Sequence, residues 1–214
     1  MRVALRSFKI LQHTYGHARS VRAQACIDGN GDPIPWYTYP AIEYLKQLQL
    51  SDRLVFEYGC GNSSLFWQRV AKRVVAVEDN KKWYALIEPK LGANAKVTLA
   101  PDKESYVRTI LESDPAFDIV VVDGSYRLAC ARAAVARLKT GGLIILDNSD
   151  WCSKTAEYLR GQGLLEVDMA GFGPINPYIW VTSFFFDRTF SFARSAAFSP
   201  TTPAGGLCQQ SDDA

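Results

Sequence analysis

The segment LVFEYGCGNSSLFWQRVAKRVVAVED, residues 54–79, decides the fold. It starts with an apolar run rich in strand-forming residues and passes through a turn with two glycines. Apolar residues at helical spacing follow, and a second apolar run ends in two acids. A strand, turn, helix and strand in this order predict a βαβ unit, whose two strands are parallel. The segment therefore indicates an open α/β sheet.

Further apolar runs along the chain extend this sheet. Near-continuous apolar character is typical of parallel strands that are buried on both faces. The expected parallel strands are residues 54–59, 73–79, 96–100, 117–124 and 141–148. Two more runs, 164–172 and 178–187, are joined by the turn-forming residues GPINP, which predict an antiparallel hairpin at the sheet edge. We expect an α/β fold: a Rossmann-like, doubly wound, seven-stranded and mostly parallel sheet with an antiparallel C-terminal hairpin strand and helices on both faces.

The two ends of the chain differ from this central domain, which we expect at residues 51–190. Residues 1–50 predict a helical extension, in which the aromatic loop PWYTYP (35–40) is a candidate lid over the site. Residues 199–214 are rich in Ser, Thr, Pro and Gly, and we expect a disordered tail there.

Composition is that of an ordinary globular protein, with 48% hydrophobic and 21% charged residues. The net charge of +2 is too small to indicate nucleic-acid binding. No acid precedes Asp28, whereas five basic residues do, so this segment is either a solvated helix or a basic arm for a partner. Its two histidines, His13 and His17, are expected on the surface.

Localisation follows from what the sequence lacks. No apolar stretch approaches the length of a membrane span, and the N-terminus lacks the apolar core of a signal peptide. The five cysteines are scattered and form no CxxC pair, as expected of reduced thiols. We expect a cytoplasmic protein with no membrane partner, and the pattern is compatible with a homodimer.

The glycine-rich turn EYGCGNSS (57–64) predicts a nucleoside site, since it follows a strand and precedes a helix. Gly59 and Gly61 let the backbone approach a ligand, and the helix that begins near Ser63 offers free N–H groups. Glu78, at the end of the second strand, is placed to accept hydrogen bonds from ribose hydroxyls. A tight βα corner without a ligand is the structural alternative.

Two residues bear on which nucleoside is bound. A dinucleotide fingerprint has a third glycine where this chain has Ser64, and the Glu57 carboxylate would repel a pyrophosphate but suit an ammonium group. These features favour S-adenosylmethionine over NAD. An NAD-dependent oxidoreductase and an RNA-directed or non-catalytic nucleoside-binding protein remain the rival hypotheses.

The pattern E-x-G-x-G, followed by a strand that ends in an acid, resembles the class I S-adenosylmethionine-dependent methyltransferases over about residues 54–187. The resemblance implies S-adenosylmethionine as cofactor and a methyl acceptor as partner. It implies that the methionine part is lined by Glu57, Gly59, Gly61 and Ser63. It places the ribose beside Glu78 and the adenine beside Asp102, and Asp79 is expected to bind the cofactor as well.

Acids also end the fourth and fifth expected strands, at Asp123 and at Asp147–Asn148. Ligands of open α/β sheets bind at the carboxyl ends of the strands. Oxygen donors suit a divalent cation such as Mg²⁺ or Ca²⁺, and a metal held by Asp123, Asp147 and Asn148 could lower the pKa of an acceptor hydroxyl. Helix capping and turn formation are the structural alternatives.

These three residues are similar to the metal ligands of the cation-dependent catechol and caffeoyl-CoA O-methyltransferases, and Trp151 matches a tryptophan that follows the ligands in that family. Tyr126 occupies the position of that family's lysine base. Without a metal, Asp123 or Tyr126 could act as the general base. We expect methyl transfer to a small-molecule acceptor at a hydroxyl oxygen, and nucleic acid is the less favoured substrate.

Overall fold

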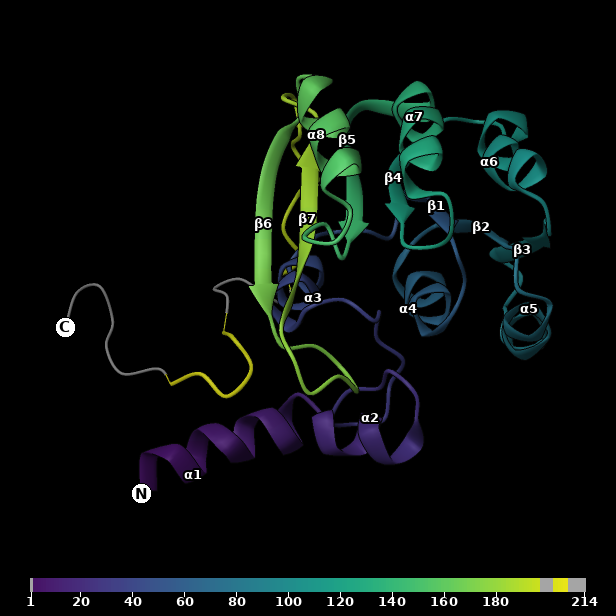
Figure 1. Cartoon of the computed structure of the whole chain (residues 1–214). Helices are drawn as coiled ribbons and strands as arrows, with labels where there is room; N and C mark the ends of the chain where they lie inside the picture. Colours follow the sequence, from purple (N-terminus) through teal and green to yellow (C-terminus); the bar gives the residue numbers. More distant parts are fainter. Residues whose placement is uncertain (1, 197–201, 208–214) are drawn as a thin grey trace.

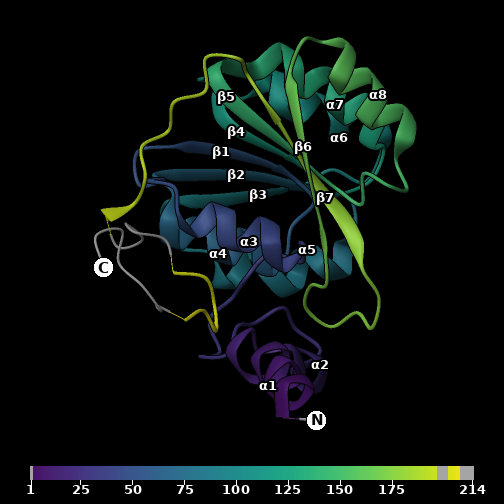
Figure 2. The ribbon, with the colours of Figure 1, turned by 90° about the vertical axis from the view of Figure 1, so that its left-hand side faces the viewer.

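The computed structural model describes residues 2–196 and 202–207. A single seven-stranded sheet forms its centre, and helices cover both faces of this sheet (Figures 1 and 2). The predicted fold class is confirmed.

The strand order is β3-β2-β1-β4-β5-β7-β6, with the first strand of the chain in the middle. The strands are β1 (Leu54–Tyr58), β2 (Arg73–Glu78), β3 (Ala95–Leu99), β4 (Phe117–Val122), β5 (Leu138–Asp147), β6 (Leu165–Gly171) and β7 (Trp180–Phe186). Strands β1 to β5 are parallel, and β7 runs antiparallel to both β5 and β6. The order in which the chain adds strands reverses between β1 and β4, so the carboxyl ends of these two parallel strands adjoin a natural binding crevice.

The helices divide between the two faces of the sheet (Figure 2). One face carries α3 (Tyr39–Lys46), α4 (Asn62–Val70) and α5 (Lys81–Ile87), which continues into a 3₁₀ turn, η2 (Glu88–Lys90). The other face carries α6 (Lys103–Glu112), α7 (Arg127–Arg137) and α8 (Ser153–Gly161).

Two hydrophobic cores result from the alternation of side chains along each strand. In β4, Ile119 and Val121 join the core under α3 and α4, whereas Val120 and Val122 join the core under α6 to α8. All four are fully buried, and burial of such a side chain contributes about 1.5–3 kcal/mol. The near-continuous apolar character of the strand is therefore explained by its two buried faces.

The N-terminal segment lies below the sheet in the view of Figure 1 and packs against the core through Leu11 and Tyr15. It comprises α1 (Arg2–Lys9), a π-helical turn η1 (Ile10–Thr14) and α2 (His17–Ala23). Helix α1 leaves large apolar side chains exposed, among them Val3 and Phe8. No helix in the described part of the chain is long and apolar enough to cross a membrane.

Some element boundaries differ from the predictions. The strand expected at residues 141–148 begins earlier, at Leu138, directly after α7 ends at Arg137. The β4–β5 pairing shifts register between Phe117 and Ile119, and the start of β5 absorbs the extra residues. Of the predicted disordered tail, residues 199–201 and 208–214 lie outside the described residues.

Candidate cofactor and active site

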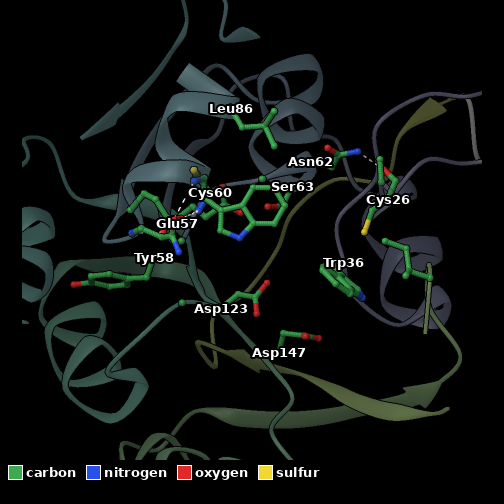
Figure 3. A pocket seen from close by; sticks show the side chains of 18 of the residues that line it. Cys26, Trp36, Glu57, Tyr58, Cys60, Asn62, Ser63, Leu86, Asp123 and Asp147 are labelled. Atoms are coloured by element: carbon green, nitrogen blue, oxygen red, sulfur yellow. Dashed lines mark hydrogen bonds between the residues drawn. The ribbon is translucent and has the colours of Figure 1, made fainter. Parts of the chain in front are cut away.

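A cavity of about 650 Å³ lies at the carboxyl ends of β1, β2, β4 and β5 (Figure 3). The strand ends contribute Glu57, Glu78, Asp123 and Asp147 to its walls. The segment after α2 contributes Ala23, Gln24, Ala25 and Cys26, and the β6–β7 connection contributes Ile175 and Asn176. Segments from both ends of the chain thus enclose the crevice at which the strand order reverses.

The glycine-rich turn is held in shape from within. Gly59 has a φ of +97°, a left-handed conformation that favours glycine. The hydroxyl of Ser64 accepts a hydrogen bond from the Gly61 N–H at 3.2 Å and donates to the Glu57 carboxylate. The residue that replaces the third glycine of a dinucleotide fingerprint therefore links the turn to the carboxylate before it.

Glu57 is a buried carboxyl group with an unused acceptor. Its side chain is 1% exposed; Oε2 accepts from Ser64, and Oε1 has no hydrogen-bond partner among the described residues. Burial raises the pKa of Glu57 to about 7, against the opposing effect of the Ser63 and Ser64 hydroxyls. A buried acceptor without a partner is costly, so this oxygen is suited to a cationic donor supplied by a ligand.

Glu78 fixes two loops at once. Its Oε2 accepts from the Cys60 N–H at 2.9 Å, and its Oε1 accepts from the Asn80 N–H at 2.8 Å. Burial raises the pKa of this carboxyl despite the two N–H donors. Each carboxylate oxygen has a second lone pair, so Glu78 is oriented by the protein and can still accept from two adjacent hydroxyls.

The segment after α2 and the β6–β7 connection form the roof of the cavity. Hydrogen bonds between distant parts of the chain hold this roof in place. The Asn62 amide donates to the Cys26 carbonyl at 2.7 Å, which ties the start of α4 to the segment after α2 (Figure 3). The His17 Nδ1 lies 3.1 Å from the Gly173 carbonyl oxygen, in the β6–β7 connection. The prediction that His17 lies on the surface is wrong, because it is buried between these two parts of the roof.

Asp123 follows β4 and faces the cavity close to Asp147 (Figure 3). Burial and the neighbouring Asp147 raise the pKa of Asp123 well above its usual value, and the Arg127 guanidinium opposes them. Arg127 Nη2 donates to Asp123 Oδ1 at 3.1 Å. A carboxyl group with a raised pKa in a cavity is a candidate proton acceptor.

Asp147 ends β5 in a more enclosed position. Its Oδ1 accepts from Trp180 Nε1 at 3.0 Å and from the Thr182 hydroxyl at 2.5 Å, both from β7. Burial raises its pKa to about 6, and these two donors oppose the rise. Asp147 therefore fastens the antiparallel strand to the site.

Comparison with known proteins adds evidence on the fold. No protein-family model matches the sequence, and no curated protein does. Among solved structures, the chain is similar to a precorrin-6y C5,15-methyltransferase from Geobacter metallireducens, with a TM-score of 0.55 and 19% identity over 69% of this chain and 87% of that one. It is also similar to an rRNA methylase from Streptococcus thermophilus, with a TM-score of 0.53 and 14% identity over 69% and 96%. A putative methyltransferase from Streptococcus mutans in complex with SAH gives a TM-score of 0.50 and 16% identity over 67% and 94%.

The chain has the methyltransferase fold. These similarities concern the fold, and they place no constraint on the acceptor. The resemblance to the cation-dependent O-methyltransferases is found in the sequence motifs alone.

Within the methyltransferase fold, most of the predicted site residues meet at one cavity. Those that line it are Glu57, Gly59, Gly61, Ser63, Glu78, Asp79, Asp123, Asp147 and Asn148. Two others are not brought there. Asp102 caps α6, where its Oδ1 accepts from the Ser105 N–H at 3.0 Å. Tyr126 directly precedes α7, has a φ of +54° and lines a separate groove on the α6–α8 face.

The three predicted metal ligands, Asp123, Asp147 and Asn148, each bind a protein donor in the structure. Arg127 Nη2 bonds to Asp123 Oδ1, and its Nη1 and Nη2 each lie 3.3 Å from Asn148 Oδ1. Asp147 Oδ1 is engaged by its two donors from β7. Among the described residues, no group of three His, Cys, Asp or Glu side chains could hold a metal ion.

Arg127 is the partner of Asp123 that the motifs do not reveal. It lies one helical turn after Asp123, an i, i+4 spacing that allows an ion pair at the start of a helix. Its Nη1 also donates to the Asp147 carbonyl oxygen. The spacing alone could have indicated the ion pair with Asp123, but not the contacts with β5.

Proposed function

We propose that the protein is an S-adenosylmethionine-dependent methyltransferase that acts on a hydroxyl oxygen of a small-molecule acceptor. The main observation behind this proposal is the pair of buried glutamates that flank the glycine-rich turn. One has an acceptor oxygen without a partner, and the other has both oxygens oriented by backbone N–H groups.

The methionine half would bind beside Glu57. Its α-ammonium group supplies the cationic donor that Glu57 Oε1 lacks, and pairing with a cation favours the ionised form of a carboxyl whose pKa is about 7. Gly59 and Gly61 leave room for the ligand next to the backbone, and Ser63 lines the same wall.

The nucleoside half would extend toward β2. Glu78 would accept hydrogen bonds from the two ribose hydroxyls, for which it is already oriented. Asp79 and Trp83 line the cavity beyond it, and the Trp83 indole is 43% exposed. An exposed aromatic face beside a nucleoside site is suited to stacking on the base.

S-adenosylmethionine supplies a methyl group that its sulfonium already activates. Asp123 would accept the proton of the acceptor hydroxyl as that oxygen forms its bond to the methyl carbon. The carbon–sulfur bond breaks with its electron pair on sulfur, so the products are a methyl ether and S-adenosylhomocysteine. Arg127 holds Asp123 in place for this proton transfer, and Trp36 and Trp180 line the cavity and exclude water.

The rival cofactor fits the same cavity less well. NAD would bring its pyrophosphate to the turn next to the Glu57 carboxylate, and like charges repel in a buried site. The Ser64 hydroxyl forms hydrogen bonds with both Glu57 and Gly61. Its side chain therefore stabilises the turn at the position where a dinucleotide fingerprint has glycine.

Thermal unfolding with and without ligand tests the proposal. A ligand at 100 times its Kd adds about 2.7 kcal/mol to the free energy of unfolding, and about 2–4 °C per kcal/mol is usual for this chain length. We therefore expect S-adenosylhomocysteine to raise Tm by roughly 5–10 °C and NAD to leave it unchanged. A shift with NAD but none with S-adenosylmethionine or S-adenosylhomocysteine would reject the proposal.

A further inference from the structure

A second concavity of about 730 Å³ lies on the α6–α8 face, at the starts of these three helices. We call it the basic groove, because Lys103, Arg127, Arg132 and Lys154 line it. None of the residues that line the groove is acidic. A concavity of this composition has a positive potential and attracts anions.

Three of the four cations are free to bind a ligand. Among the described residues, none of Lys103, Arg132 and Lys154 has a carboxylate within 4.0 Å. Lys103 Nζ lies 5.8 Å from the ring centre of Tyr126, and the Arg132 guanidinium lies 5.5 Å from that of Tyr158. Contacts with aromatic faces orient a cation without neutralising its charge.

The fourth cation, Arg127, is already engaged by the protein. Each of the three guanidinium nitrogens of Arg127 has a protein acceptor, on Gly124, Asn148 or Asp123. Arg127 therefore lines the basic groove and at the same time contacts Asp123 in the neighbouring cavity. Gly124 lines both concavities, so the two adjoin each other at one turn.

The remaining walls suit an aromatic or heterocyclic group next to the charge. Trp151 and Tyr126 line the groove with 62% and 41% of their surface exposed, and Ser153 adds a hydroxyl group. Exposed aromatic rings beside unpaired cations are typical of sites that bind nucleotides and other aromatic phosphates.

We propose that the basic groove binds a phosphate group carried by the methyl acceptor. A phosphate dianion matches three unpaired cations better than a single carboxylate does, and its oxygens can accept from several donors at once. The adjacency of the two concavities would place the rest of the acceptor near Asp123. That the methyl acceptor carries this phosphate rests on the proposed function. Phosphate binding itself can be measured independently of methyl transfer.

The test follows the Trp151 indole N–H signal in ¹⁵N spectra of the full chain while phenyl phosphate or inorganic phosphate is added. Replacement of Trp151 by Phe assigns the signal. We expect a saturable shift in the wild type and at least a tenfold loss of affinity in the double variant Arg132→Gln, Lys154→Gln. Affinity for S-adenosylhomocysteine should be equal in both proteins, which separates this inference from the proposed function.

The matched control is the double variant Lys72→Gln, Lys96→Gln, which removes the same charge from exposed residues outside the groove. It should bind phosphate as the wild type does. Equal losses in the two double variants, or no saturation at 20 mM of either phosphate, would overturn the proposal.

A short single-stranded RNA forms a second arm of the same titration and identifies the source of the phosphate. Tighter binding of phenyl phosphate than of RNA, with little dependence on salt, would indicate a small phosphorylated acceptor. Tighter binding of RNA, with a steep dependence on salt, would indicate a polynucleotide, since counterions are released from its backbone.

Discussion

Replacement of Arg127 by Met should destabilise the protein strongly, and more at high pH than at low pH. Arg127 and Asp123 are only 19% and 23% exposed, and the guanidinium also bonds to Asn148. Removal of one partner of a buried ion pair costs about 3–5 kcal/mol. Because about a fifth of each side chain reaches solvent, we expect about 3 kcal/mol at pH 8, at the lower end of that range.

The pH dependence follows from the raised pKa values of the two aspartates. A carboxyl whose pKa is higher in the folded than in the unfolded protein contributes stability at low pH, and this contribution is lost as pH rises through the folded pKa. The pKa of Asp147 is about 6, and that of Asp123 is raised as well. Without Arg127 both values rise further, so the variant loses more stability than the wild type between pH 5 and pH 8. One further unit of pKa corresponds to about 1.4 kcal/mol.

Urea unfolding at pH 5 and pH 8 measures both effects. Arg108→Met is the matched control, since Arg108 forms i, i+4 ion pairs with Glu104 and Glu112 on the exposed side of α6. Such exposed pairs contribute about 0–1 kcal/mol. If Arg127→Met costs no more than Arg108→Met at pH 8, or the same amount at both pH values, our account of the Arg127 contacts is refuted.

Three further predictions concern the turn and the cavity. Gly124→Ala should lower the free energy of unfolding in urea by about 2–3 kcal/mol, since a Cβ there would lie 2.0 Å from the hydroxyl oxygen of Tyr106. Gly161→Ala is the control and should leave this free energy unchanged, because a Cβ there would have no atom within 4 Å. In calorimetry, Glu57→Gln should weaken the binding of S-adenosylhomocysteine about 10- to 100-fold but leave the binding of methylthioadenosine, which lacks the amino acid, unchanged. Glu78→Gln should weaken the binding of both ligands. Equal effects of the two variants would count against the assigned roles. Asp123→Asn should lower kcat about 10²–10⁴-fold and abolish the fall in rate toward acidic pH, and an unaltered pH–rate profile would exclude Asp123 as the base.

The fold and the cavity wall around the glycine-rich turn were predictable because their signals are local. The turn that contains Gly59 and Gly61 lies within a single βαβ unit, and the acid at the end of the second strand belongs to the same unit. The order of the strands then brings Asp123 and Asp147 to the same edge, since the carboxyl ends of parallel strands meet there.

The rest of the site depends on the direction in which individual side chains point, which residue spacing does not determine. Tyr126 follows Asp123 by three residues, yet its left-handed backbone turns it to the other side of the turn. Asp123 and Asn148 have the composition of a metal site, but Arg127 supplies the cation. The burial of His17 results from a contact with Gly173, 156 residues away, and no local pattern reveals it.

Isothermal titration of S-adenosylhomocysteine into the wild-type protein tests the central claim, that the cavity between Glu57 and Glu78 is a site for this nucleoside. The account predicts saturable binding of one ligand per chain, with no heat of binding from NAD under the same conditions. Absence of binding by both S-adenosylhomocysteine and S-adenosylmethionine at millimolar concentration would contradict it.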